Sequence, residues 1–387
     1  MTPAARHQAA IDILDRILGG APAEQALTSW ARGARYAGSK DRAAIRDLVF
    51  DALRCLRSFA HVGGELSGRG LILGALRMHG VDPKTIFTGT GYGPAPLSDA
   101  ESNFTPPPMP DPVALDCPDW LFAPFKDSLG PDAAPILQAL RQRAPVFLRV
   151  NLARSDRDAA IAALQAEQII AEPHPLAPTA LEVTANARAL HRAQAYLDGL
   201  VELQDAASQA VIAELIPLRG LRALDYCAGG GGKALALAAQ GTLVTAHDAN
   251  QARMRDLPQR AARARAAITL TDSPEGLFDL VLTDVPCSGT GSWRRAPAGK
   301  WSLTSDKLAE LHRTQAQILD DAAAYVSAGG RLAYVTCSLL DSENQMQTDA
   351  FLSRNPAFSL ELARRFTPME GGDGFYLARL LRNPSAG

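Results

Sequence analysis

The sequence lacks two features of membrane and secreted proteins. It has no apolar run long enough to span a bilayer, and it does not open with the charged and then apolar segments of a signal peptide. Cysteine is also scarce. The 387 residues include only five, which is an odd number, and they are widely spaced. This usage argues against a disulfide framework and for a reducing compartment, and no spacing suits a zinc site. We therefore expect a cytoplasmic protein that binds neither a membrane nor a metal.

An excess of charge of one sign is missing as well. The 39 lysines and arginines nearly balance the 41 acidic residues, so the net charge of -2 does not announce a nucleic-acid partner. The balance is uneven along the chain, however, since residues 1–85 carry 12 basic and 8 acidic side chains. An apolar content of 47% is typical of a globular chain with an ample core, and the length predicts two or three domains.

Glycine is concentrated in one stretch, Asp225-Tyr226-Cys227-Ala228-Gly229-Gly230-Gly231-Gly232-Lys233. An apolar run precedes it and a helix-forming run follows, so the stretch reads as strand, turn and helix, which presents backbone N–H groups to a nucleotide-like ligand. A phosphate-binding loop would need glycine at position 227 and Ser or Thr at 234, where Cys227 and Ala234 stand. A dinucleotide fingerprint would need glycine at 234 too. S-adenosylmethionine, which has no pyrophosphate, suits the turn better, and a solvent-exposed loop between domains is the alternative.

Three segments precede the domain that contains this turn. Residues 1–83 predict a helical bundle, with a helix from about Ala9 to Leu18 and another capped by Ser39. The polar face of the second helix is either a solvated face or a phosphate-contacting surface, and its basic residues are Arg42, Arg46, Arg54 and Arg57. Residues 84–116 are rich in Gly, Pro, Thr and Ser and predict a linker. Residues 117–200 predict a small α+β module, with strands at 146–151 and 180–184 and a helix capped by Ser155.

Residues 201–387 alternate strands with helices, which predicts a mainly parallel sheet covered on both faces. We expect strands at about 222–227, 242–248, 267–272, 278–285 and 331–336. Ligands bind at the carboxyl ends of such strands, and acidic residues end three of them: Asp248, Asp272 and Asp284. The first is placed to bind ribose hydroxyls, and the second to meet an adenine amino group.

Two cysteines follow adjacent strands of the predicted sheet. Cys287 stands in a polar stretch after Asp-Val-Pro, and Cys337 lies between Thr336 and Ser338. A buried cysteine is usually inert, but a thiolate at this edge can attack an electron-poor ring carbon. Addition to C6 of cytosine makes C5 enamine-like, so that C5 takes a methyl group from a sulfonium. One cysteine for attack and another for the exit steps is chemically coherent.

Taken in order, five segments resemble the RsmB-like branch of the Nop/Sun family of RNA cytosine-5 methyltransferases. The segments are Gln204 to Gln209, Asp225 to Lys233, Asp284 to Gly291, Thr336-Cys337-Ser338 and Asp373 to Tyr376. The resemblance covers about Trp120 to Arg379, and it is weaker between the N-terminal bundle and the NusB-type RNA-binding fold. It implies an α/β, Rossmann-like class I methyltransferase domain after a small α+β (RRM-like) module and a NusB-like bundle. The domain limits would be 1–83, 84–116 for the linker, 117–200 and 201–387.

The resemblance also implies roles for single residues. Cys337 would be the nucleophile, Cys287 would assist product release, and Asp284 would contact the target base and the cofactor region. The S-adenosyl-L-methionine site would be lined by Cys227, Ala228, Gly229, Gly230, Gly231, Gly232, Lys233, Asp248, Asp272 and Asp284. Gly229-Gly230 replaces the family's usual Ala-Pro, and we expect this exchange to give a looser loop and a lower cofactor affinity.

The expected reaction is C5-methylation of a cytosine in 16S ribosomal RNA, with transfer RNA as the second candidate substrate. We expect a monomer. Two other classes stay open: a catalytically weak RNA-binding assembly factor, and a methyltransferase for protein or small molecules. The second class would need neither Cys337 nor the basic segment that Trp293 and Trp301 flank. These two aromatics suit stacking on single-stranded RNA, and packing within a loop is the alternative.

Overall fold

The computed structural model describes residues 1–215 and 217–384, which divide by compactness into two units. Unit 1 comprises Met1–Arg143 and Trp293–Ser302, and unit 2 comprises Ala144–Ser292 and the residues from Leu303 onward. Compactness thus groups residues 117–143 with the helical unit, whereas the sequence pattern placed the start of the small module at residue 117. None of the helices that the structure describes is long and apolar enough to cross a membrane.

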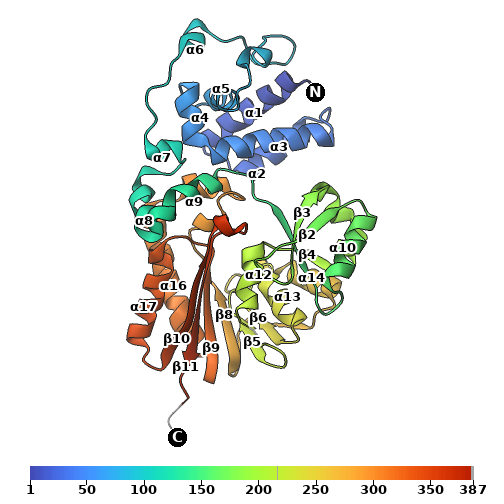
Figure 1. Ribbon diagram of the computed structural model, residues 1–387, viewed down its shortest axis with the longest axis vertical. Coiled ribbons are helices and arrows are strands. Elements are labelled where there is room, and N and C mark those ends of the chain that lie inside the picture. Colours follow the sequence, from blue (N-terminus) through green and yellow to red (C-terminus); the bar gives the residue numbers. More distant parts are fainter. Residues whose placement is uncertain (216, 385–387) are drawn as a thin grey trace. The chain divides into compact units, whose positions relative to one another are not determined.

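Among its described residues, unit 1 contains helices and irregular segments and no strands (Figure 1). Its elements are α1 (Pro3–Leu18), α2 (Ala23–Gly33), α3 (Ser39–Arg54), α4 (Leu56–Gly63), α5 (Gly68–Met78), η1 (Pro83–Thr85), α6 (Asp99–Asn103), α7 (Asp111–Ala114), α8 (Asp119–Leu129), η2 (Gly130–Asp132), α9 (Ala133–Leu140) and α15 (Pro297–Ser302). The predicted apolar stripe of α3 is buried at Ile45, Val49 and Ala52, where it packs on α1 and α5. Gly38, rather than Ser39, is the N-cap of α3, and its N–H donates to the Asp41 carboxylate at 3.2 Å.

Most of the arginines of the predicted basic face, which lie on α3 and α4, are engaged inside unit 1. Arg46 forms two hydrogen bonds to Glu24. Arg57 pairs with Asp119 at 2.7 Å, and the buried Arg54 donates to the Arg294 carbonyl at 2.8 Å. These side chains are therefore neither a simple solvated face nor an open phosphate-binding surface.

The segment at 84–116, expected as a linker, is fastened to the helical bundle of unit 1. Arg69 on α5 donates to the carbonyls of Ala95 and Pro96 and pairs with Glu101 at 2.6 Å. The hydrogen bonds from Arg69 lower the pKa of Glu101 to about 2. The glycine and proline content correctly predicted an irregular backbone for this segment. Composition could not reveal that Arg69 holds the segment to α5.

Ten residues from the C-terminal half of the sequence also belong to unit 1. Trp293 is 2% exposed and packs edge-on against Phe125, with ring centroids 5.7 Å apart. Lys300 is buried, donates to the Arg54 carbonyl at 2.9 Å, and has its pKa lowered to about 8 by burial. The indole N–H of Trp301 donates to the Leu53 carbonyl at 2.7 Å. Packing within unit 1 occupies Trp293, so its interpretation as an RNA-stacking platform is wrong. The stacking role of Trp301, which is half-buried, stays a prediction.

Unit 2 contains two sheets (Figure 1). The smaller is antiparallel, in the order β2-β3-β1-β4, and forms the predicted α+β module together with α10. Its elements are β1 (Val146–Val150), α10 (Arg157–Ala166), β2 (Ile170–Pro173), β3 (Ala180–Ala185), η3 (Ala187–Arg192), α11 (Gln194–Leu197) and β4 (Val201–Leu203). Asp156, rather than Ser155, caps α10, because its carboxylate accepts the Ala159 N–H at 2.8 Å. Strands β2 and β4 were not predicted, being only four and three residues long.

The larger sheet has seven strands in the order β10-β11-β9-β8-β5-β6-β7. Its strands are β5 (Arg222–Asp225), β6 (Leu243–Ala246), β7 (Ile268–Leu270), β8 (Phe278–Asp284), β9 (Val326–Thr336), β10 (Phe358–Phe366) and β11 (Phe375–Arg382). The pairs among β5 to β9 are parallel, as predicted, and β11 joins β9 in antiparallel fashion. The fold is therefore Rossmann-like, as expected, with a C-terminal hairpin that was not predicted.

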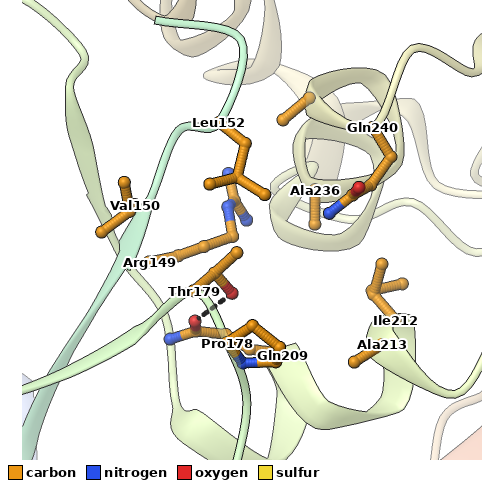
Figure 2. Close-up of a pocket in the computed structure, with 11 residues that line it drawn as sticks. Arg149, Val150, Leu152, Pro178, Thr179, Gln209, Ile212, Ala213, Ala236 and Gln240 are labelled. Atoms are coloured by element: carbon orange, nitrogen blue, oxygen red, sulfur yellow. Dashed lines mark hydrogen bonds between the residues drawn. The ribbon is translucent and has the colours of Figure 1, made fainter. Parts of the chain in front are cut away.

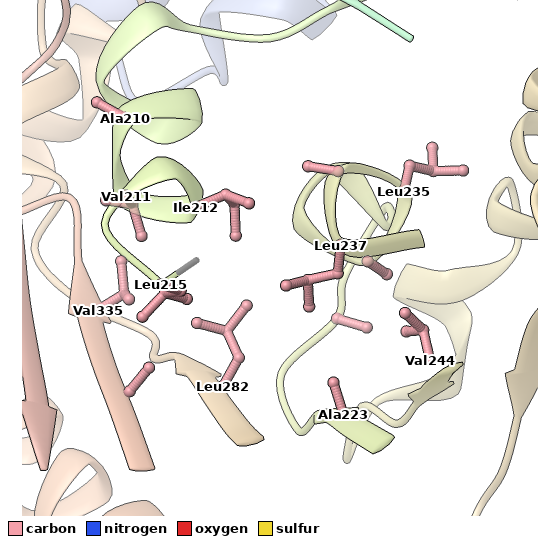
Figure 3. Close-up of a cluster of buried hydrophobic side chains, with 14 of the residues drawn as sticks. Ala210, Val211, Ile212, Leu215, Ala223, Leu235, Leu237, Val244, Leu282 and Val335 are labelled. Atoms are coloured by element: carbon pink, nitrogen blue, oxygen red, sulfur yellow. The ribbon is translucent and has the colours of Figure 1, made fainter. Parts of the chain in front are cut away.

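Helices cover both faces of this sheet (Figure 1). One face packs on α12 (Ala206–Ala213), α13 (Gly232–Ala239) and α14 (Leu257–Ala264), and the other on α16 (Ser305–Ala323) and α17 (Gln345–Arg354). The short η4 (Gln251–Met254), η5 (Thr290–Ser292), η6 (Asp341–Glu343) and η7 (Pro368–Glu370) lie in the connections. Successive residues of one strand point to opposite faces, so Leu282 joins the α12–α13 core shown in Figure 3, and Val281 joins the α16–α17 core.

Truncation of Trp293 tests how firmly its segment belongs to unit 1. We expect Trp293→Ala to lower the free energy of unfolding by about 3–5 kcal/mol, because a fully packed indole is removed. Trp293→Phe should cost much less, since it keeps a ring against Phe125 and the indole N–H has no hydrogen-bond partner among the described residues. Urea unfolding followed by circular dichroism measures both, with Trp120→Ala, at a position 39% exposed, as the control. Equal losses of stability in the Ala and Phe variants would contradict this packing.

Candidate active site

The glycine turn lies between the end of β5 and the start of α13, where the sequence pattern predicted it. Gly229 and Gly231 have φ angles of +51° and +79°, a left-handed region that disfavours other residues. At Gly231 there is also no room, because an added Cβ would come within 2.1 Å of Leu257 Cδ1 on α14. Glycine at position 231 therefore lets the turn pack directly on α14.

Two arginines hold carbonyl groups of the turn. Arg260 on α14 donates to the Gly230 carbonyl and is itself paired with Glu202 at 3.5 Å. Arg149 on β1 donates to the Gly232 carbonyl at 2.7 Å. Arg149 is 3% exposed, and burial lowers its pKa to about 10. These contacts restrain a turn that its glycine content alone would leave loose.

Two buried acids lie beside the turn. Asp225 is 1% exposed, and its pKa is raised to about 7, first by burial and then by the charge of Asp284. Neither of its oxygens has a hydrogen bond of normal geometry among the described residues, although the Ala234 amide lies near enough to favour the charged form. Asp248, after β6, accepts the Gly229 N–H at 2.9 Å and pairs with Arg253 at 3.1 Å. Both acids therefore face the turn from strand ends, as the sequence predicted for Asp248.

Lys233 and Asp284 form an ion pair with a 2.6 Å separation between Nζ and Oδ2. Burial opposes the charge on Lys233, but the nearby Asp284 carboxylate outweighs it and raises the lysine pKa. The ammonium also lies 5.1 Å from the Phe375 ring centroid. The Lys233 side chain is 8% exposed and that of Asp284 is 35% exposed, so the carboxylate is the accessible member of the pair.

The two predicted cysteines meet. Cys287 Sγ and Cys337 Sγ are 3.3 Å apart, which allows one thiol to donate a hydrogen bond to the other sulfur. That hydrogen bond, with burial and the neighbouring charges of Cys337 and Glu343, raises the pKa of Cys287 well above its usual value. Cys227 is half-buried in the turn, and burial raises its pKa too. The geometry therefore gives two partly buried sulfurs in direct contact at the strand ends.

The remaining predicted site residue, Asp272, is exposed in the loop after β7. The structure also contains a cavity of about 140 Å³ between the small sheet and helices α12 and α13 (Figure 2). Arg149 lines it, together with the hydrogen-bonded pair Thr179 and Gln209. The cavity contains none of the predicted cysteines, strand-end acids or turn glycines, so it is separate from the strand-end site.

Two family models match the sequence of this chain. The family model described as 16S rRNA methyltransferase RsmB/F matches residues 213–381, and the ferredoxin-like domain of the same proteins matches residues 117–189. Ribosomal RNA small subunit methyltransferase B of Xylella fastidiosa (strain Temecula1) is 35% identical over 291 residues, covering 69% of this chain and 67% of that protein. The chain belongs to the RsmB/F family. The protein of the same name from Citrobacter koseri is 33% identical over 284 residues, and the chain spans only 66% of that relative's length.

Solved structures share the fold of this RsmB/F family member. PH0851 covers 98% of the chain and 99% of its own, with a TM-score of 0.78 at 21% sequence identity. NSun6 from Pyrococcus horikoshii, solved with SFG, covers 68% of the chain and 98% of its own, with a TM-score of 0.61 at 18% identity. At these identities the likeness concerns the fold alone.

Local sequence patterns did not mark several residues that hold the site of this RsmB/F protein in place. Arg149 and Arg260 clamp the glycine turn from 83 and 30 residues away in sequence, and no motif contains them. Glu343 is fully buried and contacts the residues that follow both cysteines. A buried glutamate six residues after Cys337 carries no motif that one sequence reveals.

A pair of alanine substitutions tests the packing of the turn. Gly231→Ala should strongly weaken cofactor binding and lower stability, because the methyl group would overlap Leu257 and the φ angle of +79° is unfavourable for alanine. Gly230→Ala should be mild, since the only atom near its Cβ is Nη1 of the flexible Arg260, at 3.1 Å. Calorimetric titration with S-adenosylmethionine, together with thermal unfolding, measures both effects. A harmless Gly231→Ala variant would refute this account of the turn.

Proposed function

We propose that the chain transfers a methyl group from S-adenosyl-L-methionine to C5 of a cytosine in 16S ribosomal RNA. The observation that carries the proposal is the pair of cysteine sulfurs 3.3 Å apart, after adjacent parallel strands β8 and β9. A methyltransferase for protein or small molecules has no use for such a pair. Membership of the RsmB/F family supports ribosomal RNA as the substrate.

The residues around the glycine turn fit the proposed cofactor. Asp248 has room for a further hydrogen bond, because a carboxylate has about four acceptor sites and three are used, by the Gly229 and Asn250 amides and by Arg253. That site suits a ribose hydroxyl, and the exposed Asp272 is available to an adenine amino group. When bound, the cofactor supplies an electrophilic methyl group on its sulfonium. The residues proposed to line its site are Cys227, Ala228, Gly229, Gly230, Gly231, Gly232, Lys233, Asp248, Asp272 and Asp284.

The protein's own part begins with the Cys337 thiolate, which forms a bond to C6 of the cytosine and drives the C5–C6 electron pair onto C5. Asp284, fixed by Lys233, accepts a hydrogen bond from the exocyclic amino group of the base and orients the ring. C5 takes the methyl group. Release then requires that the C5 proton leaves and that the bond between C6 and sulfur breaks. The Cys287 thiol passes its proton to the departing Cys337 sulfur, 3.3 Å away, and the Cys287 sulfur takes up the C5 proton in exchange as the C5–C6 double bond re-forms.

Bisulfite sequencing tests the activity directly. RNA from a strain that lacks the gene should lose protection at one cytosine of 16S ribosomal RNA, and the wild-type gene should restore it. Loss of protection in the transfer RNA fraction instead would point to the second candidate substrate. Unchanged protection in all RNA would favour the assembly-factor alternative.

The two cysteines are expected to fail at different steps. Cys287→Ala should still attack and methylate, and it should then stall as a covalent protein–RNA complex. Cys337→Ala should bind RNA and form neither complex nor product. A denaturing gel with labelled RNA shows the complex as a slow band, which the double variant should lack. A slow band from Cys337→Ala alone would reverse the two assignments, and full methylation by both single variants would remove covalent catalysis.

We also propose that the helical unit contacts RNA through an exposed cluster at the α2–α3 turn. Tyr36 is 75% exposed, and the basic residues Arg32, Arg35 and Lys40 around it in sequence are exposed as well. An aromatic ring among cationic side chains suits single-stranded RNA, which offers stacking bases and phosphates. This cluster replaces the α3 arginines as the proposed contact surface, because most of those are engaged inside unit 1.

Neutralising that cluster should weaken RNA binding and flatten its salt dependence. For each phosphate of single-stranded RNA that the variant no longer neutralises, the slope of log K against log salt should fall by about 0.7. The triple variant Arg32→Gln/Arg35→Gln/Lys40→Gln is compared with Arg16→Gln/Lys84→Gln, which removes exposed charges elsewhere in unit 1. Filter binding at several salt concentrations gives the slopes. Because the first variant removes three charges and the second two, an equal change per charge removed would show that only net charge matters.

A further inference from the structure

Glu343 makes a concentrated set of hydrogen bonds behind the cysteine pair. Its carboxylate is fully buried in η6. Oε1 accepts the Ser288 N–H at 2.8 Å and the Gln315 side-chain amide at 3.0 Å. Oε2 accepts the hydroxyl groups of Ser288 and Ser338, each at 2.5 Å. One carboxylate therefore holds three residues from three separate segments.

The three segments are those that place the two sulfurs. Ser288 directly follows Cys287, and Ser338 directly follows Cys337. Gln315, on α16, uses the same amide nitrogen to donate to the Pro286 carbonyl at 3.0 Å, on the other side of Cys287. The backbone of Glu343 is held in place as well, because the Tyr334 hydroxyl donates to the Glu343 carbonyl at 2.6 Å.

Full burial is unusual for a glutamate. No lysine or arginine pairs with it among the residues that the structure describes, so its burial is balanced only by hydrogen bonds. A buried carboxylate without a cation is rarely the most stable choice for a core position. The four hydrogen bonds to this carboxylate therefore direct attention to the residues that they hold in place.

The two cysteines depend on this carboxylate unequally. Cys337 comes directly after the long central strand β9, and its carbonyl accepts the Gly291 N–H at 2.9 Å. Cys287 lies three residues beyond the end of β8, and its neighbour Ser288 gives both its N–H and its hydroxyl to Glu343. Removal of the carboxylate should thus release Cys287 much more than Cys337.

We propose that Glu343 is a positioning residue that holds Cys287 against Cys337 for the release step. The proposal rests on the proposed function for its catalytic consequence, but the positioning itself is independent of any reaction. Glu343→Ala should leave attack by Cys337 intact and impair release, the same outcome that we expect for Cys287→Ala. Glu343→Gln keeps an acceptor oxygen for the Ser288 N–H and an amide that can donate to the two serine hydroxyls, so it should behave nearly as wild type.

Disulfide formation measures the distance between the sulfurs without RNA or cofactor. Diamide takes up the two thiol protons and two electrons as it is reduced to a hydrazine, and the Cys287–Cys337 bond forms. Wild-type protein and Glu343→Gln should form this bond rapidly, and Glu343→Ala should form it at least tenfold more slowly. Mass spectrometry of the linked peptides follows the rate, and Glu275→Ala, which removes an exposed carboxylate before β8, is the matched control. Wild-type rates in Glu343→Ala would overturn the proposal.

A second readout separates positioning from general damage. On the denaturing gel, Glu343→Ala should accumulate the covalent RNA complex, and Glu343→Gln should not. A Glu343→Ala variant that retains its disulfide rate, or that loses the complex and the product together while folded, would refute the assignment. If Glu343→Ala does not fold, Ser288→Ala removes one hydroxyl bond and should slow disulfide formation severalfold. The wild-type protein could fail to methylate RNA while Glu343→Ala still slows disulfide formation. That result would refute the proposed function and support the positioning role of Glu343.

Discussion

The parallel pairing of β8 with both β5 and β9 is the constraint on which the site depends. It aligns Asp225 with Leu282 and Asp284 with Val335, so the ends of three strands reach the same edge of the sheet. Side chains that are far apart in sequence meet there, including Lys233 with Asp284 and Cys287 with Cys337. A shift of one residue in either register would turn Asp284 to the opposite face and break both contacts.

Much of this arrangement was predictable from the sequence because local signals carried it. Strand, glycine turn and helix follow each other within twenty residues, and acids or cysteines end the next strands. Parallel strands bring such ends together whatever the details of packing. Strand order therefore decides which strand ends meet at this edge, and the register decides which side chains come into contact there. The short strands β2 and β4 and the hairpin of β10 and β11 could not be predicted from the sequence. Their local strand preference is weak, and they form because they pair with neighbouring strands.

What could not be predicted depends on contacts across long sequence separations. Arg149 and Arg260 look like ordinary charged residues until the fold places them against the Gly232 and Gly230 carbonyls. Composition therefore predicted a loose turn, whereas the structure restrains it from two sides. The burial of Trp293 could not be predicted for the same reason. A tryptophan beside arginines has the same sequence pattern whether it faces RNA or packs on Phe125.

The segment from Trp293 to Ser302 has a consequence for how such a protein could have been assembled. The chain passes from unit 1 to unit 2 near residue 144, returns after Ser292 and leaves again after Ser302. The helical unit is therefore discontinuous in the gene, and a single recombination junction could neither add it nor remove it intact. Exchange of residues 1–143 alone between relatives should therefore separate Trp293 and Lys300 from the residues that they contact, Phe125 and Arg54.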